Sequence, residues 1–375
     1  MKILYVTNLR LPTEKAHGKQ IMETCNAMAG QGVDMTLLIP RRVNPLKENA
    51  FSFYGLQPSF SIRKVFCVDL LFLPFLKKFF FGLENSSFTI SSFLNVFLGS
   101  GRQYEIIYTR DLAVAFFLSW LKPVVYEIHN LPDNPGFFSR WAWQRARHII
   151  VISLGLRGDL VGFGVDADKI ILARDAVDLK KFDINISRED ARKRLDMGFE
   201  ERVVLYTGHL FPWKGADLLA ETAYLLPEAQ LYFVGGSEED IKKFRKKYKA
   251  DNVHIIGYRP ADEVPVWLKA ADLLVLPNRG QYKISSRYTS PLKLFEYMAS
   301  GTPIVAAGLS SIREIVSEGE ALFFRDGDVA SLAEVLSKTF SGQIDLKSRA
   351  EKAKIKAGEF TWNKRAQIIL NSIKP

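Results

Sequence analysis

The chain has 375 residues, which is too long for one ordinary hydrophobic core and predicts two domains. Hydrophobic residues make up 47% and charged residues 25%, a globular composition that excludes a disordered chain. The formal net charge is +10, and residues 1–150 carry +7 of it, because they hold 17 Lys and Arg against 10 Asp and Glu. A basic N-terminal half suits anionic lipid, a phosphorylated substrate or nucleic acid. Nucleic acid ranks last, because no basic block with interleaved aromatics and no helix-turn-helix or RNA-module signature occurs.

The cysteines and the start of the chain favour the cytoplasm. Cys25 and Cys67 lie far apart and match no metal-binding or redox spacing, which suits a reducing compartment. The opening MKILYVTNL has only a short apolar run before Asn8 and Arg10, so we expect a first strand and no signal peptide.

Apolar, β-rich runs alternate with helical patterns along the whole chain. The predicted strands of the first half are KILYVTN, VDMTLLIP, EIIYTR, VVYEI and HIIVIS, with a helix around IMETCNAMAGQG. The pattern restarts with VVLYTG and continues with AQLYFVGG, VHIIGY, LLVLPN, PIVAAG and ALFF, followed by a helix capped by Asp328. Strands separated by helices predict parallel sheets with both faces covered.

We therefore predict an α/β fold with two doubly wound, Rossmann-like domains that face each other across a cleft. The predicted domains are residues 1–180 and 195–359, with a polar hinge region at about 178–194. Such folds bind ligands at the carboxyl ends of their strands. Neither half carries G-x-G-x-x-G after a strand, and VGGSEED and GFG are only weak matches. This counts against a Rossmann-type oxidoreductase, which stays as one alternative.

Two segments that follow predicted strands are suited to phosphate. GHLFPWKG (208–215) is a glycine-bounded loop before a helix, which can direct backbone amides and Lys214 at an anion. The alternative is a surface lysine in a turn. In SPLKLFEYMASGTP we expect a helix with Ser290 as its cap, Pro291 in its first turn and Gly301 after its end. The amino end of that helix, residues 290–293, is again suited to phosphate.

Glu296 lies in the middle of this short apolar helix. An ionised carboxylate only accepts hydrogen bonds, so it can hold both hydroxyls of a ribose. Phosphates at the helix start and a sugar diol at Glu296 describe a nucleotide. The alternative is an i,i+3 ion pair with Lys293, which contributes only tenths of a kcal/mol.

Two residues of the first half are further candidates. His129 ends the predicted strand of YEIHNLP, where the alternative is a histidine bonded to a loop carbonyl. Gly18 lies in TEKAHGKQ, which we expect to be a loop between the first strand and the first helix. A glycine there permits the close approach of a ligand, or merely a turn.

Together these motifs resemble the retaining glycosyltransferases of family four, which have the two-domain GT-B fold. The resembling segments are YTRD (108–111), YEIH (126–129), RDAVDLKKF (174–182), LYTGHLFPWKG, SPLKLFEYMASGTPIVA and FTWNKRAQIILNSI (360–373). They occur in the family's order along nearly the whole chain. The last resembles the helix that crosses back to the first domain, here residues 360–375.

The resemblance implies transfer of a hexose from a UDP- or GDP-linked sugar to a glycan or lipid-linked acceptor, with retained anomeric configuration, no metal and no cofactor. Lys214 would hold the diphosphate, Glu296 the ribose and His129 the donor sugar, while Gly18 would flank the phosphates. The implied donor site comprises Gly18, Gly208, His209, Lys214, Tyr288, Ser290, Pro291, Leu292 and Glu296, the implied catalytic residues are His129 and Lys214, and the acceptor side holds Arg110 and Asp111. A non-catalytic nucleotide-sugar-binding protein at a membrane surface is the second alternative.

Two departures from the family pattern concern the donor. Many members carry a glutamate where this chain has Tyr288, which puts a carboxylate contact to the transferred sugar in doubt. They also often carry arginine where this chain has His209, so Lys214 and the helix amides are expected to supply most of the electrostatics at the phosphates.

Residues 65–98 are rich in phenylalanine and contain the pair Lys77–Lys78. Asp69, Pro74 and Glu84 are among the interruptions that argue against a membrane span. The segment suits a helix in a membrane interface, and it suits core helices packed on the sheet equally well. In the first case the protein would be peripheral on the inner face of the cytoplasmic membrane, with an anionic surface as partner.

Overall fold

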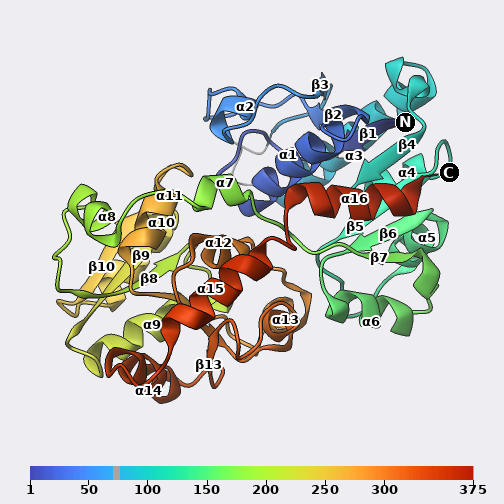
Figure 1. The fold of residues 1–375 in the computed structure, drawn as a ribbon. Helices are drawn as coiled ribbons and strands as arrows, with labels where there is room; N and C mark the ends of the chain where they lie inside the picture. Colours follow the sequence, from blue (N-terminus) through green and yellow to red (C-terminus); the bar gives the residue numbers. More distant parts are fainter. Residues whose placement is uncertain (71–76, 375) are drawn as a thin grey trace. The chain divides into compact units, whose positions relative to one another are not determined.

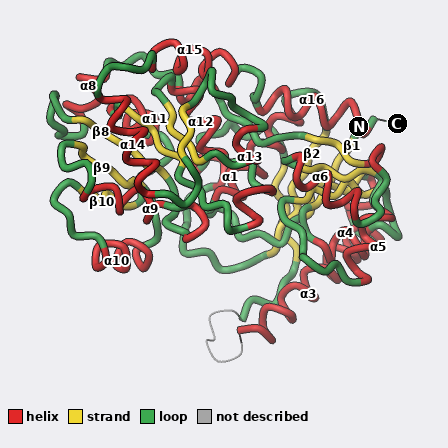
Figure 2. Tube along the Cα trace, turned by 90° about the horizontal axis from the view of Figure 1, so that it is seen from below, coloured by secondary structure: helices red, strands yellow, loops and turns green. Residues whose placement is uncertain are grey.

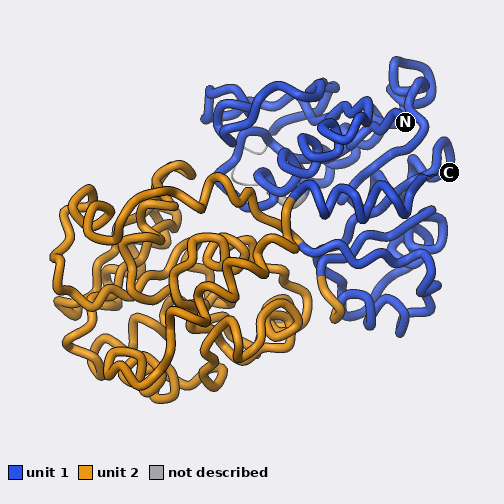
Figure 3. The backbone as a smooth tube through the Cα atoms, in the orientation of Figure 1, with its two compact units in different colours: residues 1–152, 156–174, 362–375 blue, residues 153–155, 175–361 orange. Residues whose placement is uncertain are grey.

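The structure is a computed structural model that describes residues 1–70 and 77–374 (Figure 1). The side chains of residues 77 and 78 are also left out of the description. The chain divides into two compact units (Figure 3): unit 1 comprises residues 1–152, 156–174 and 362–375, and unit 2 comprises residues 153–155 and 175–361. The predicted hinge region at about 178–194 is therefore part of unit 2.

Unit 1 contains a seven-stranded parallel sheet with the order β3-β2-β1-β4-β5-β6-β7. Its strands are β1 (Lys2–Val6), β2 (Asp34–Pro40), β3 (Ser61–Val65), β4 (Ile106–Thr109), β5 (Val124–Ile128), β6 (His148–Val151) and β7 (Ile170–Leu172). Strands β4 and β5 are buried along their whole length, as expected for apolar runs covered on both faces.

Helices cover both faces of this sheet. The helices are α1 (Ala16–Ala29), α2 (Ala50–Phe53), α3 (Lys77–Phe97), α4 (Leu112–Leu118), α5 (Phe137–Arg145), α6 (Leu154–Gly162) and α16 (Trp362–Ile373). The connection through α1 and the connection through α4 run in opposite directions along the sheet, so right-handed crossovers put these helices on opposite faces. The C-terminal α16 packs beside α1, and α3, α4 and α5 pack together (Figures 1 and 2).

Unit 2 contains a six-stranded parallel sheet with the order β10-β9-β8-β11-β12-β13. Its strands are β8 (Arg202–Thr207), β9 (Ala229–Val234), β10 (Val253–Gly257), β11 (Leu273–Leu276), β12 (Ile304–Ala307) and β13 (Leu322–Phe324). Its helices are α7 (Leu179–Phe182), α8 (Arg188–Arg194), α9 (Ala216–Glu221), α10 (Glu238–Lys247), α11 (Val264–Ala270), α12 (Leu292–Ser300), α13 (Ser310–Arg313), α14 (Val329–Phe340) and α15 (Leu346–Ala357). The α/β prediction of two doubly wound parallel sheets is confirmed.

Helix α12 begins differently from the prediction. Ser290 does not cap it: the Ser290 hydroxyl instead accepts a hydrogen bond of 3.0 Å from the backbone N–H of Asp175. Pro291 precedes the first helical residue and has no capping side chain, so α12 runs from Leu292. The helix ends as predicted, because Gly301 takes the left-handed conformation.

In the segment at residues 65–98, helix α3 has both buried and exposed apolar side chains. Residues 71–76 lie outside the described residues, as do the side chains of Lys77 and Lys78. In the described part of α3, Phe88 and Val96 are buried, and the buried Glu84 forms an ion pair with Arg42. Other apolar side chains of the same helix are exposed: Phe79, Phe81, Ile90, Leu94 and Phe97. Among residues 1–70 and 77–374, no helix has the length and apolar character required to span a bilayer.

Candidate functional site

The sheet order of unit 2 identifies one end of β8 as a ligand-binding position. From β8 the chain proceeds to β9 and β10 on one side, whereas β11 and β12 lie on the other. In open parallel sheets the crevice for a ligand forms at the carboxyl ends of the two strands where this direction changes. Gly208 directly follows β8, and Asn278 lies two residues after β11.

The loop after β8 holds Lys214 in a defined place. A 3₁₀ turn at Pro212–Lys214 is followed by Gly215 in the left-handed conformation, and α9 then begins. A methyl group on Gly215 would lie 1.8 Å from the carbonyl oxygen of Pro277, so only glycine fits this position. The backbone N–H of Arg279 also donates to the Trp213 carbonyl at 3.0 Å, which ties this loop to the segment after β11.

Lys214 itself is half-buried beside aromatic rings. Its amine lies 5.3 Å from the ring centre of Trp213 and 5.6 Å from that of Phe211. Burial lowers the pKa of Lys214 to about 8, although the carboxylate of Glu296 opposes this shift. The charge of Glu296 therefore acts on the Lys214 amine.

Lys293, on α12, is a site residue that the sequence reasoning treated only as an ion-pair partner. Its side chain is 8% exposed, and its amine lies 3.9 Å from the ring centre of Tyr206. The amine makes no hydrogen bond to any residue in the described part of the chain. Burial first, and the charge of Lys214 second, lower the pKa of Lys293 well below its usual value, while Glu296 opposes them. The importance of Lys293 depends on its burial and on the neighbouring Lys214, which the local sequence does not show.

Asn278 is the second residue that the sequence reasoning missed. Its side chain is 1% exposed, and neither its amide nitrogen nor its amide oxygen has a hydrogen-bond partner among the described residues. Leaving such a group unsatisfied costs free energy, so an unsatisfied amide at this strand end points to a ligand or water.

The chain departs from the family pattern at Tyr288 and His209, and both side chains pack against neighbouring residues. Tyr288 is 1% exposed at the end of a π-helical turn, Ile284–Tyr288, and the amine of Lys283 lies 5.2 Å from its ring centre. The His209 imidazole stacks on Phe211 with ring centres 5.0 Å apart.

The remaining predicted donor residues lie at and along α12. Leu292 and Glu296 are partly exposed on this helix, and Pro291, which precedes it, is buried.

In unit 1 the corresponding change of direction lies between β1 and β4. Arg110 and Asp111 directly follow β4. The Asp111 carboxylate accepts a hydrogen bond of 2.9 Å from the backbone N–H of Asn8, which follows β1 by two residues. Burial raises the pKa of Asp111, although the bond from Asn8 and neighbouring arginines oppose this. Arg110 donates to the Gln20 side chain at 2.8 Å. Arg110 and Asp111 thus lie at the carboxyl end of β4.

A buried network around Glu127 positions His129. The Glu127 carboxylate accepts from Gln20 at 2.6 Å, from Arg365 at 2.8 Å and from the Tyr108 hydroxyl. His129 Nε2 lies 2.5 Å from the same carboxylate. Arg365 belongs to α16, so the last helix of the chain contributes to the environment of His129.

The charges in this network follow from burial and pairing. Burial would raise the pKa of Glu127, but Arg365, the bond from His129 and the charge of Arg110 hold it well below its usual value. Burial and Arg110 lower the pKa of His129 to about 4, although Glu127 opposes them. His129 is therefore a neutral imidazole that donates Nε2–H to an ionised carboxylate, which leaves Nδ1 as the acceptor.

Gly18 differs from the prediction. It lies within the first turn of α1 and not in the loop before that helix. A methyl group on Gly18 would lie 2.2 Å from the hydroxyl of Tyr54 and 2.5 Å from Thr13. The Tyr54 hydroxyl accepts from the Thr13 N–H and donates to the Thr13 carbonyl. Close packing of Tyr54 accounts for this glycine without a ligand.

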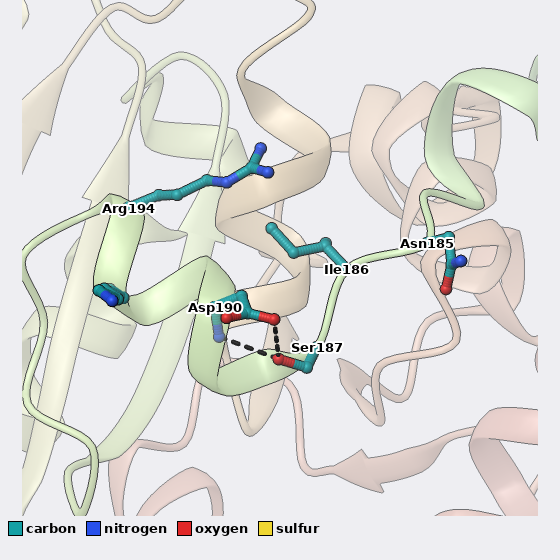
Figure 4. Close-up of a pocket in the computed structure, with 6 residues that line it drawn as sticks. Asn185, Ile186, Ser187, Asp190 and Arg194 are labelled. Carbon is teal, nitrogen blue, oxygen red and sulfur yellow. Dashed lines mark hydrogen bonds between the residues drawn. The ribbon is translucent and has the colours of Figure 1, made fainter.

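One pocket of about 580 Å³ lies at the start of α8 (Figure 4). It is lined by Asn185, Ile186, Ser187, Asp190, Lys193 and Arg194. Within it, the Ser187 hydroxyl donates to the Asp190 carboxylate at 2.7 Å and accepts from the Asp190 N–H at 3.0 Å. These bonds are those of a helix N-cap, so they explain the positions of Ser187 and Asp190 without a ligand.

Two protein families match the chain. Residues 18–181 match the family described as Glycosyltransferase Family 4, and residues 201–341 match the family described as Glycosyl transferases group 1. The sulfoquinovosyl transferase of Arabidopsis thaliana is 27% identical over 237 residues, a match that covers 58% of this chain and 44% of that protein. The matches span about half the length of the curated relatives.

Solved structures share the fold over the whole chain. The sucrose-phosphate synthase of Thermosynechococcus elongatus superposes with a TM-score of 0.80 at 18% identity, covering 99% of this chain and 97% of that one. HepE of Anabaena, in complex with UDP-glucose, superposes with a TM-score of 0.75 at 17% identity, covering 100% of both chains. At these identities the likeness shows a common GT-B fold.

Proposed function

The chain belongs to glycosyltransferase family 4, and from this premise we propose that it transfers a sugar from a nucleotide-diphosphate sugar to a glycan or lipid-linked acceptor. The observation that carries the proposal is the meeting of Lys214, Lys293 and Glu296 at the carboxyl end of β8. Cations for a diphosphate and a carboxylate for a ribose lie together where the sheet order predicts a ligand.

The proposed donor is UDP- or GDP-linked. Lys214 binds the diphosphate, Glu296 accepts hydrogen bonds from the ribose hydroxyls, and the start of α12 contributes its backbone N–H groups. A UDP-glucose complex is known for HepE of Anabaena, a structural neighbour, which supports testing UDP-sugars first. From the resemblance to the family we further propose that His129 binds the donor sugar, and that Arg110 and Asp111 bind the acceptor.

The proposed reaction retains the anomeric configuration and needs no metal ion. The bond from the anomeric carbon to the phosphate oxygen breaks, and a bond to the acceptor oxygen forms on the same face. The acceptor proton passes to the departing phosphate oxygen. The protein positions both substrates and stabilises the charge that develops on the leaving diphosphate.

A two-step screen tests this function. Thermal-shift measurements across UDP-, GDP- and ADP-sugars identify the donor, since a ligand that binds the folded state raises the melting temperature. Release of the nucleoside diphosphate then measures turnover. Binding without turnover on any glycan or lipid-linked acceptor favours the non-catalytic alternative. Stabilisation by a nicotinamide dinucleotide alone favours an oxidoreductase.

Replacing Glu296 by alanine is expected to weaken nucleotide binding by one to two orders of magnitude. The reason is the loss of charge-assisted hydrogen bonds to the ribose, which contribute about 1.5–3 kcal/mol. Isothermal titration calorimetry with UDP or GDP measures this effect. Glu228→Ala is the matched control, because Glu228 is an exposed glutamate of the same unit. An unchanged affinity in Glu296→Ala would refute the ribose assignment.

Nucleotide affinity is expected to fall as the pH rises through about 8. Phosphate groups are fully ionised above pH 7, because their second pKa is about 6. The pKa of Lys214, lowered to about 8, makes its amine charged below this pH and neutral above it. The affinity at pH 9.5 should therefore be at least about tenfold lower than at pH 7. Lys214→Arg, which stays charged, should lose less nucleotide affinity over the same pH range. An equal loss in Lys214→Arg and the wild type would contradict the assignment of Lys214 to the diphosphate.

The acceptor is proposed to lie at an anionic membrane surface. Helices α3, α4 and α5, together with the turn after α4, carry exposed large apolar side chains: Phe79, Phe81, Ile90, Leu94, Phe97, Phe117, Trp120, Phe137 and Phe138. The Arg145 guanidinium lies 4.7 Å from the ring centre of Trp120, so positive charge accompanies this aromatic surface. Exposed aromatics with basic residues suit the interface of an anionic bilayer.

Co-sedimentation with liposomes tests this location. Each basic residue near an anionic surface contributes about 1 kcal/mol to membrane binding, and salt screens this attraction. Binding should therefore require anionic lipid and weaken as the salt concentration rises. Replacing Trp120, Phe137 and Phe138 by serine, or Lys77, Lys78 and residues 79–81 by alanine, should reduce it. Protein that stays in the supernatant with anionic vesicles at low salt would instead indicate a soluble acceptor.

A further inference from the structure

Two lysine amines converge on one small volume at the end of β8. A methyl group on Gly208 would lie 3.7 Å from the amine of Lys214 and 3.8 Å from the amine of Lys293. The two side chains come from different elements, the 3₁₀ turn after β8 and the helix α12. The volume between them stays open because residue 208 has no side chain.

The groups around this volume do not neutralise two amines. The Tyr206 hydroxyl, 3.9 Å from the same methyl position, donates to the His209 carbonyl, and its ring faces Lys293. Glu296 is the acidic group whose charge acts on both amines. Two close amines with only one nearby carboxylate form a site in which a bound anion would stabilise the charged form of both lysines.

We propose that Lys293 and Lys214 together bind the diphosphate of the nucleotide, and that a proton enters Lys293 when this anion binds. The proposal rests on the proposed function and extends it to a residue and a coupling that the sequence did not reveal. A nucleotide sugar carries two phosphate charges, which two protonated lysines match.

The coupling follows from the two environments of Lys293. Without a ligand, burial and the neighbouring Lys214 disfavour its charged form, and the amine has no hydrogen-bond partner among the described residues. A diphosphate in the volume at Gly208 would provide both a partner and an opposite charge, which favour the charged form. A group that is neutral when free and charged when bound takes up a proton on binding. The charged amine then faces the leaving group during transfer.

Lys293→Met is the decisive variant because it keeps the side-chain length and suits a buried site. It removes a buried amine without a partner, so the melting temperature of the ligand-free protein should rise, by roughly 2–4 °C. Its affinity for UDP, or for GDP if the screen selects it, should fall about 10–100-fold. A lysine that only supports the fold would give the opposite change in melting temperature.

Calorimetric titration in buffers of different ionisation enthalpy measures the proton directly. Between pH 7 and 9.5 the uptake by the wild type should exceed that by Lys293→Met by close to one proton per nucleotide at its maximum. Lys243→Met, which changes an exposed lysine of the same unit paired with Glu239, should match the wild type. Nucleotide binding with equal uptake in the wild type and Lys293→Met overturns this inference and leaves the proposed function standing. Absence of binding by every nucleotide in the wild type overturns both.

Discussion

Lys214→Ala is expected to lower kcat by about 10²–10³-fold, the effect of removing one preorganised group from developing charge. Lys214 lies in a loop fixed by the fit of Gly215 against Pro277 and by the bond from Arg279 to Trp213. A cation held in this way does not reorganise as the diphosphate leaves, so its loss raises the barrier of the chemical step. Initial rates of nucleoside diphosphate release, at saturating donor, measure kcat.

The control for Lys214→Ala is Lys243→Ala, which removes an exposed lysine from α10 in the same unit. Lys243→Ala should leave kcat unchanged, because a surface ion pair contributes little. A normal kcat in Lys214→Ala would indicate that Lys214 is an ordinary lysine in a surface turn, without a role in the reaction.

Replacing Arg365 by methionine is expected to destabilise unit 1 by about 3–5 kcal/mol. The Arg365 guanidinium is buried and donates to Glu127 at 2.8 Å, to the Thr24 hydroxyl at 3.0 Å and to the Arg174 carbonyl at 3.1 Å. Its removal leaves the buried carboxylate of Glu127 without its principal cation. Scanning calorimetry should show the transition of unit 1 lowered by roughly 10 °C.

Two comparisons separate this effect from a general loss of packing. Arg365→Met combined with Glu127→Gln should recover part of the stability, because the uncompensated charge is removed. Lys2→Met, which breaks an exposed ion pair with Asp34 in the same unit, should cost less than about 1 kcal/mol. If Arg365→Met lowered the free energy of unfolding by as little as Lys2→Met does, a stabilising role for the Arg365–Glu127 pair would be contradicted.

The parallel sheets were predictable because their strands are apolar along their whole length. The two edge strands of unit 1 were not predicted: β3 reads SIRKV and is largely exposed, and β7 has only three residues. Neither produces a continuous buried run, so both lack the sequence pattern that identifies a central strand.

The site was predictable where local sequence determines local structure. The glycine-bounded loop with Lys214 and the short helix with Glu296 could be located from their spacing alone. Lys293, Asn278 and Arg365 could not, because their importance depends on burial and on partners distant in sequence. The hydrogen bond from the Asp175 N–H to the Ser290 hydroxyl shows the same limit: a long-range contact replaced the capping role that the local motif indicated.

The central claim, sugar transfer with retention, is tested most directly by proton NMR of the reaction in progress. The wild-type protein is mixed with the donor selected by the thermal-shift screen and with a panel of glycan and lipid-linked acceptors. We predict the appearance of a new anomeric signal with the same configuration as the donor, together with one equivalent of nucleoside diphosphate. A product with inverted configuration would contradict the retaining mechanism, and an unchanged donor signal with every acceptor would contradict sugar transfer itself.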